Sequence, residues 1–142
     1  MDLEREQNEE QKIELTEEMV GDISFEDVCF RYGSRKEIFS ALNLTIEKGK
    51  MTAIVGESGS GKTTLMSLLQ HIYPIQGGHI RIGKHDIAEI DNRSLRQRIG
   101  TVPQHIELFS GTITENIAVG ELHPKMIRIK ALMEMLGLEE FI

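Results

Sequence analysis

The sequence has a single cysteine, Cys29, in 142 residues. An internal disulfide is therefore impossible, and a reducing, cytosolic setting is expected. No apolar run approaches the ~18 residues that a membrane-spanning helix requires, and the N-terminal MDLEREQNEEQK lacks the apolar stretch of a secretory signal. These absences predict a soluble domain that folds without disulfides.

Basic charge is also scarce, because 16 Lys and Arg face 23 Asp and Glu, for a net charge of −7. Eight acids and two bases fall within residues 1–19, so the remainder is nearly neutral. Binding to a nucleic-acid backbone requires clustered Lys and Arg, so we expect no nucleic-acid partner. We interpret residues 1–20 as an acidic linker, with an interaction tail as the alternative, and residues 21–142 as the folded domain.

Apolar residues alternate in two early segments, which predicts β-strands. Ile23 and Phe25 share one parity and Val28 and Phe30 the other, so a bulge is expected at Glu26–Asp27. Residues 42–47, LNLTIE, alternate again. The continuous apolar run at 51–55, MTAIV, is typical of a buried parallel strand.

Later segments mix helical and extended patterns. Apolar residues at helical spacing predict a helix from residue 63 to 72, ended by Pro74. Strands are expected at 79–83 and 99–102, with a short helix at 94–100 between them. Further along, a capping-box pattern predicts another short helix, and a proline opens a last one. The residues of that pattern are Thr112 with Glu115, then Pro124, and the expected buried face comprises Ile127, Ala131, Leu132, Met135 and Leu136.

The segment GESGSGKT, residues 56–63, satisfies the pattern G-x-x-x-x-G-K-[ST] of a phosphate-binding P-loop. Gly59 and Gly61 permit positive φ, so that successive N–H groups can point at phosphate oxygens. Lys62 can bridge the β- and γ-phosphates, Thr63 offers a hydroxyl to Mg²⁺, and the following helix adds its positive dipole end. The expected phosphate-binding residues are Gly56, Glu57, Ser58, Gly59, Ser60, Gly61, Lys62 and Thr63.

Two residues outside the P-loop are further candidates for a nucleotide site. Tyr32 follows a predicted strand and could stack on a purine, although alone it would be read as a core or edge aromatic. Gln104 ends a predicted strand about forty residues after the loop, where a lone glutamine is usually a surface residue. The P-loop, Tyr32 and Gln104 are an unusual combination in one short chain.

Three segments in order resemble the nucleotide-binding domain of ABC transporters: VCFRYGS, LTIEKGKMTAIVGESGSGKTTL and GHIRIGKHDIAEIDNRSLRQRIGTVPQHIELFSGTITENI. The resemblance runs from about Gly21 to the C-terminus, and LFSGTITENI is similar to the exporter branch. The preceding acidic segment and first strand resemble those of peptide or bacteriocin exporters that carry a processing peptidase. One mild departure is Gly83-Lys84, where the family often has Asp-Gly.

This resemblance implies an α/β fold, with a RecA-like P-loop NTPase core and an antiparallel β subdomain, and ATP and Mg²⁺ as cofactors. Tyr32 matches the aromatic residue that stacks on adenine, and Thr64 continues the phosphate contacts. Gln104 matches the glutamine that reaches Mg²⁺ and the attacking water. Lys62 and Gln104 are thus the expected catalytic residues, and Thr63 and Gln104 the expected metal contacts.

The resemblance also implies partners, namely a transmembrane domain of the same transporter and a second nucleotide-binding domain. The parent protein is then expected at the cytoplasmic face of the membrane, where ATP hydrolysis drives export of a peptide or bacteriocin.

The sequence contains no LSGGQ-like run and no apolar strand followed by Asp-Glu, so it stops short of the signature and Walker B motifs. We therefore expect the chain alone to bind nucleotide without efficient hydrolysis. We also expect an open apolar sheet edge beside residues 51–55 and self-association through it. The alternatives are a binding-only or assembly fragment, and another P-loop ATPase or kinase.

Overall fold

The computed structural model describes residues 12–119, 121, 123–138 and 140. The chain divides into two compact units, Met1–Thr101 and Val102–Ile142. No helix among the described residues combines the length and the apolar character needed to cross a bilayer.

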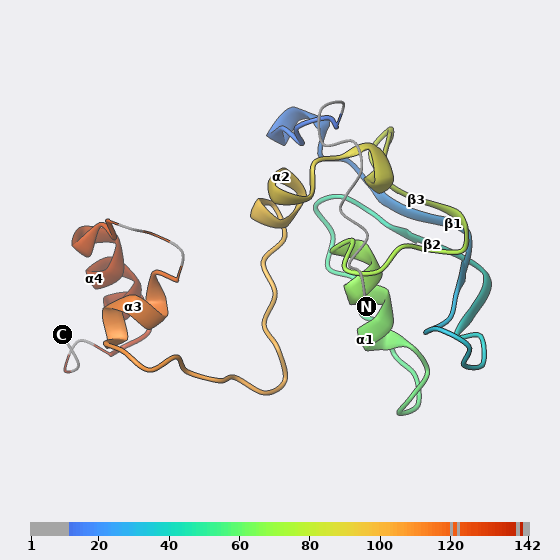
Figure 1. Ribbon diagram of the computed structural model, residues 1–142. Coiled ribbons are helices and arrows are strands. Elements are labelled where there is room, and N and C mark those ends of the chain that lie inside the picture. Colours follow the sequence, from blue (N-terminus) through green and yellow to red (C-terminus); the bar gives the residue numbers. More distant parts are fainter. Residues whose placement is uncertain (1–11, 120, 122, 139, 141–142) are drawn as a thin grey trace, which may run out of the picture. The chain divides into compact units, whose positions relative to one another are not determined.

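An antiparallel sheet organises the first unit (Figure 1). Its register shifts around Asp27, whose φ is 49°, so the bulge expected at Glu26–Asp27 is confirmed. The antiparallel subdomain is confirmed as well. Among the described residues the sheet has four strands in the order β2-β1-β3-β4, which are β1 (Ile23–Phe30), β2 (Phe39–Ile46), β3 (Gly77–Ile82) and β4 (His85–Asp86).

Helix α1 (Lys62–Leu69) lies beside this sheet (Figure 1), and its buried leucines belong to the core cluster that the sheet residues form. Leu65 and Leu68 are almost fully buried and belong to one core cluster with Phe25 and Ile80 of the sheet. Burial of such side chains contributes roughly 1.5–3 kcal/mol each. The core therefore fixes the start of α1 relative to the end of β1.

The strands expected at 51–55 and 99–102 are not present. Met51 is fully exposed and Val55 is 89% exposed. A parallel strand exists only where a neighbouring strand accepts and donates its backbone hydrogen bonds. Within the described residues neither segment has such a neighbour, so apolar, β-favouring composition alone does not make a strand here.

Part of the predicted acidic linker packs on the first unit. Ile13 pairs in parallel with Ile90, and Leu15 is only 3% exposed within the core. The Leu15 N–H donates to the Ser94 hydroxyl at 3.0 Å, so the segment is held by both burial and hydrogen bonding. The described residues of this segment continue into the 3-10 helix η2 (Glu17–Met19). Residues 1–11 lie outside the described part of the chain.

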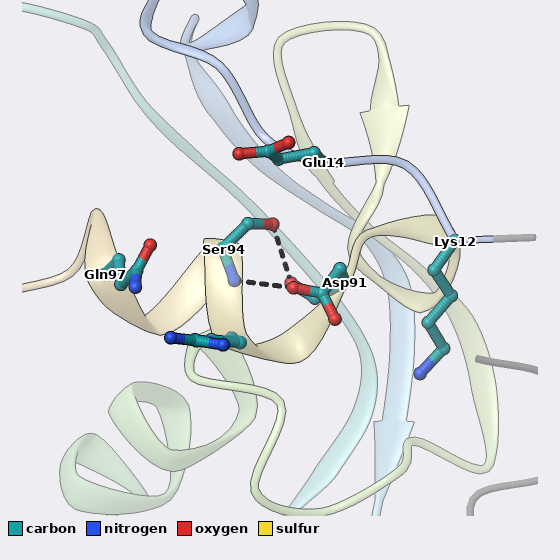
Figure 2. A pocket seen from close by; sticks show the side chains of 6 residues that line it. Lys12, Glu14, Asp91, Ser94 and Gln97 are labelled. Carbon is teal, nitrogen blue, oxygen red and sulfur yellow. Dashed lines mark hydrogen bonds between the residues drawn. The ribbon is translucent and has the colours of Figure 1, made fainter. Parts of the chain in front are cut away.

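Helix α2 (Asn92–Gln97) begins beside this segment, after the 3-10 helix η3 (Ile87–Glu89). The Asp91 carboxylate accepts a hydrogen bond from the Ser94 N–H at 2.8 Å, which is an N-cap (Figure 2). A hollow of about 490 Å³ lies here, and both acids and bases line it. Ser94, which is buried, already donates to the Asp91 carbonyl, so we assign this hollow no ligand.

The second unit contains α3 (Ile113–Ile117) and α4 (Met126–Met135). The expected capping box is confirmed, because the Thr112 hydroxyl accepts from Glu115 N while Glu115 accepts from Thr112 N. The expected buried face of α4 is wrong. Ile129 and Met133 are buried, whereas the residues chosen from the spacing are exposed. Apolar residues occur on all sides of this helix, so their spacing does not identify one buried face.

The Glu115 carboxylate should titrate below its ordinary value of 4.5, because hydrogen bonds from the backbone and then the hydroxyl of Thr112 lower its pKa. A lowered folded-state pKa means that the cap's contribution is complete above pH 4.5 and is lost as the pH falls through the lower value. NMR titration of Glu115 should show the lowered pKa. In Thr112→Ala, which loses the hydroxyl and keeps the backbone N–H, the pKa should rise part of the way toward 4.5. Titration at the ordinary value in the unmodified chain would contradict the cap.

Candidate functional site

The loop at residues 56–63 joins the exposed 51–55 segment to the first turn of α1. Gly59 and Gly61 have φ of 84° and 95°, so the positive φ expected at both is confirmed. A Cβ on Gly61 would lie 2.8 Å from Phe39 Cε1 and 2.9 Å from Ile38 Cγ2. Glycine is therefore required at position 61 for two reasons: the positive φ of its backbone and the close approach of the residues at the start of β2.

The Lys62 ammonium lies against the loop's own oxygen atoms. Its Nζ donates to the carbonyls of Gly56 at 2.8 Å and Glu57 at 2.6 Å, and to the Ser60 hydroxyl at 3.3 Å. An ammonium has three donors and can exchange these acceptors for anionic oxygens, to which charge-assisted bonds are stronger. The sequence thus places an ammonium group beside the N-terminus of α1, where an anion would be stabilised.

The structure brings Tyr32 to the same helix. Tyr32 is half-buried just beyond the end of β1, and its hydroxyl donates to Thr64 Oγ1 at 3.3 Å. Thr64 is itself buried, being 7% exposed. The packing of α1 on the sheet therefore joins two predicted site residues that are 32 positions apart.

Tyr73 is an aromatic neighbour of Tyr32 that no motif in the sequence predicts. The rings of Tyr32 and Tyr73 meet edge-on, with centroids 5.1 Å apart and an interplanar angle of 87°. Phe30 meets Tyr32 in the same way at 4.9 Å and 84°. The available signal was that Tyr73 is the only other tyrosine in the sequence and directly precedes the proline that follows α1.

A hollow of about 530 Å³ lies on the Tyr32 side of the unit, lined by Tyr32, Gly33, Ser34 and Arg35. It is wide open to solvent, so it could contact a ligand from one side and would not enclose it. An aromatic ring at its wall and a guanidinium nearby suit a planar, anion-bearing ligand such as a nucleotide.

Metal-binding capacity depends on oxygen donors, which Mg²⁺ prefers. Thr63 is exposed in the first turn of α1, so its hydroxyl fits the role expected from the sequence. Gln104 is exposed in the second unit, outside any helix or strand. Its expected contact with Mg²⁺ and water, like the roles of the other site residues, stays a prediction.

Comparison with known proteins gives one matching family and several similar proteins. The family described as ABC transporter matches residues 39–142. A similar curated protein is the mitochondrial iron-sulfur clusters transporter ATM1 of Gibberella zeae, 46% identical over 103 residues that make up 72% of this chain and 15% of that protein. The transport/processing ATP-binding protein ComA of Streptococcus pneumoniae is 39% identical over 112 residues, which cover 79% of this chain and 16% of ComA.

Among solved structures, a bacterial Atm1-family ABC exporter with ATP bound superposes with a TM-score of 0.79 at 35% sequence identity. That alignment covers 86% of this chain and 22% of the exporter. The chain thus spans less than a quarter of the length of each of these relatives. The similarity confirms the expected P-loop α/β fold.

Proposed function

Since the chain belongs to the ABC transporter family, as its match over residues 39–142 shows, we propose that its loop and Tyr32 form the Mg-ATP site of an exporter ATPase domain. The supporting observation is the hydrogen bond from the Tyr32 hydroxyl to Thr64. It connects the aromatic residue proposed for adenine with the helix whose N-terminus is proposed for the phosphates.

Each residue has a defined part in this proposal. The N–H groups at the start of α1 have no acceptor within the helix, so they can bind the phosphate oxygens of ATP. Lys62 exchanges the loop carbonyls for β- and γ-phosphate oxygens, and Thr63 supplies a hydroxyl ligand to Mg²⁺. When bound, Mg²⁺ neutralises charge that develops on the phosphates. Gln104 is proposed to contact the metal and the attacking water.

For the full-length protein we propose ATP hydrolysis coupled to export, at the cytoplasmic face of a membrane, with a transmembrane domain and a second ATPase domain as partners. We propose a peptide as cargo, on the resemblance of the N-terminal segment to peptide exporters. A further relative, the leukotoxin translocation ATP-binding protein LktB of Mannheimia glucosida, is 41% identical over 126 residues, 88% of this chain and 18% of LktB. The names of the Atm1 relatives instead specify iron-sulfur clusters.

Tyr32→Ala should weaken Mg-ATP binding by about tenfold, because base–aromatic stacking contributes roughly 1–3 kcal/mol. Tyr32→Phe should retain most of the affinity, since it keeps the ring and loses only the hydroxyl that reaches Thr64. Titration with a fluorescent ATP analogue and Mg²⁺ gives both affinities. Equal binding by Tyr32→Ala and the unmodified chain would refute the role of Tyr32 in base binding.

A further inference from the structure

Tyr73 touches the ring proposed to carry the base without belonging to the P-loop or to β1. Its centroid lies 5.1 Å from that of Tyr32 and 6.1 Å from that of Phe30. Phe30 is 4.9 Å from Tyr32. If Phe30 and Tyr73 flanked opposite faces of Tyr32, their separation would approach the sum of their distances to it. The separation is much shorter than that sum, so both neighbours lie on the same side of Tyr32. Tyr32 also lines a hollow of about 530 Å³, where a ligand could meet its ring.

The chain after α1 is shaped to bring Tyr73 back to this position. α1 ends at Leu69, and His71 adopts a left-handed backbone with φ 51°, which is costly for a residue with a side chain. The Ile72 N–H then donates to the Ser67 carbonyl at 3.0 Å, which closes the reversal. The strained backbone at His71 thus directs the following residue toward the sheet.

Helix α2 holds this reversal in place. The His71 ring bonds to the Asn92 side chain at 2.8 Å. Arg96 donates from Nη2 to the His71 carbonyl at 3.2 Å and from Nε to the Gln70 carbonyl at 3.3 Å. A charged donor on two carbonyls at the end of α1 stabilises that end and the turn beyond it. The location of Tyr73 is therefore set by two helices as well as by its own packing.

The two neighbours of Tyr32 differ in burial. Phe30 is 2% exposed and belongs to the core, so its ring is fixed. Tyr73 is 42% exposed, so its ring is not required to fill the core. Edge-to-face pairs contribute about 0.5–1.5 kcal/mol beyond burial and prefer one relative orientation. A ring at position 73 can thus fix the plane of the Tyr32 ring, while the stability of the core does not depend on it.

We propose that Tyr73 is a positioning residue for nucleotide base recognition: it holds the Tyr32 ring in the plane on which the base stacks. This inference rests on the proposed ATP site and adds a residue to it. It requires an aromatic ring at position 73, with or without a hydroxyl. It also requires that Tyr73 affect the base and leave the phosphates untouched.

The test compares the affinity for Mg-ATP with the affinity for Mg-tripolyphosphate, which has phosphates and no base. Tyr73→Leu should lower the ratio of these affinities by about two- to tenfold, with tripolyphosphate binding unchanged. Tyr73→Phe should keep the ratio of the unmodified chain. Ile72→Ala, at the neighbouring half-exposed position, is the matched control and should also keep it. Tyr73→Met, which also lacks a ring, replaces Tyr73→Leu if that variant does not fold, with the same expected loss.

Intrinsic fluorescence offers a second readout, because the sequence has two tyrosines and no tryptophan. In Tyr73→Phe all such emission comes from Tyr32, and it should change with Mg-ATP and not with Mg-tripolyphosphate. An unchanged affinity ratio in Tyr73→Leu, or equal loss for both ligands, would overturn the positioning role. Failure of the unmodified chain to bind either ligand would instead overturn the ATP site itself.

Discussion

Lys62→Ala is expected to weaken Mg-ATP binding by about a hundredfold while the fold is retained. Hydrogen bonds from a charged donor contribute roughly 1.5–3 kcal/mol, and Lys62 has three donors in reach of the loop's oxygen atoms. Its present partners are two loop carbonyls and a hydroxyl on exposed residues, which water can replace. Binding should therefore fall much more than stability does, as measured by titration with the fluorescent analogue.

Lys50→Ala is the matched control for this experiment. Lys50 is an exposed lysine in the same unit that forms a surface ion pair with Glu47, so its removal changes the net charge equally. Surface pairs of this kind contribute at most about 1 kcal/mol, and the affinity should hardly change. Equal losses in Lys50→Ala and Lys62→Ala would mean that binding depends on overall charge rather than on the loop.

Gly78→Ala is expected to destabilise the first unit by about 3 kcal/mol or more. Gly78 has φ 80°, and a Cβ there would overlap the backbone carbonyl oxygens of Glu26 and Asp27 at the bulge. A left-handed residue with a side chain costs roughly 1–2 kcal/mol, and overpacking typically adds 1–3 kcal/mol. The urea midpoint, followed by the emission of Tyr32 and Tyr73, should fall sharply.

Gly77→Ala tests the same explanation one position earlier. Its added Cβ would lie 3.6 Å from Cys29 Cβ, an ordinary van der Waals distance, and its φ is not positive. The midpoint should therefore change by less than the equivalent of about 1 kcal/mol. Similar losses in the two variants would show that neither the bulge nor the backbone angle sets the requirement for glycine.

Local signals predicted the elements whose stability is local. The change of parity at Glu26–Asp27 located the bulge, and Thr112 with Glu115 identified a capping box that the structure contains. Both depend on residues within a few positions of each other, which a sequence pattern records directly. The glycines of the loop belong to the same class, because positive φ is a property of one residue.

Features that depend on distant partners were predicted less well. The run at 51–55 has the composition of a buried strand, yet within the described residues it has no paired neighbour and is exposed. Leu15 lies in a segment that composition marks as a solvated linker, but its side chain finds space in the core beside Ser94. In each case the deciding contact is with residues far along the chain.

The candidate site also combines features set by local residues with features set by distant partners. The phosphate loop was predicted from its pattern, and Tyr32 was matched by resemblance. The contact of Tyr32 with Thr64 and the edge-on packing of Tyr73 required the packing of α1 on the sheet and the left-handed turn at His71. No periodicity or motif in the sequence specifies that turn, because a non-glycine residue rarely adopts it.

Calorimetric titration of the unmodified, folded chain with Mg-ATP tests directly whether the loop and Tyr32 form a nucleotide site. We expect saturable binding at one site per chain, competed by Mg-tripolyphosphate, because the loop and the N-terminus of α1 are proposed to bind the phosphates. A chain that is folded by circular dichroism and releases no heat of binding at millimolar Mg-ATP would contradict it.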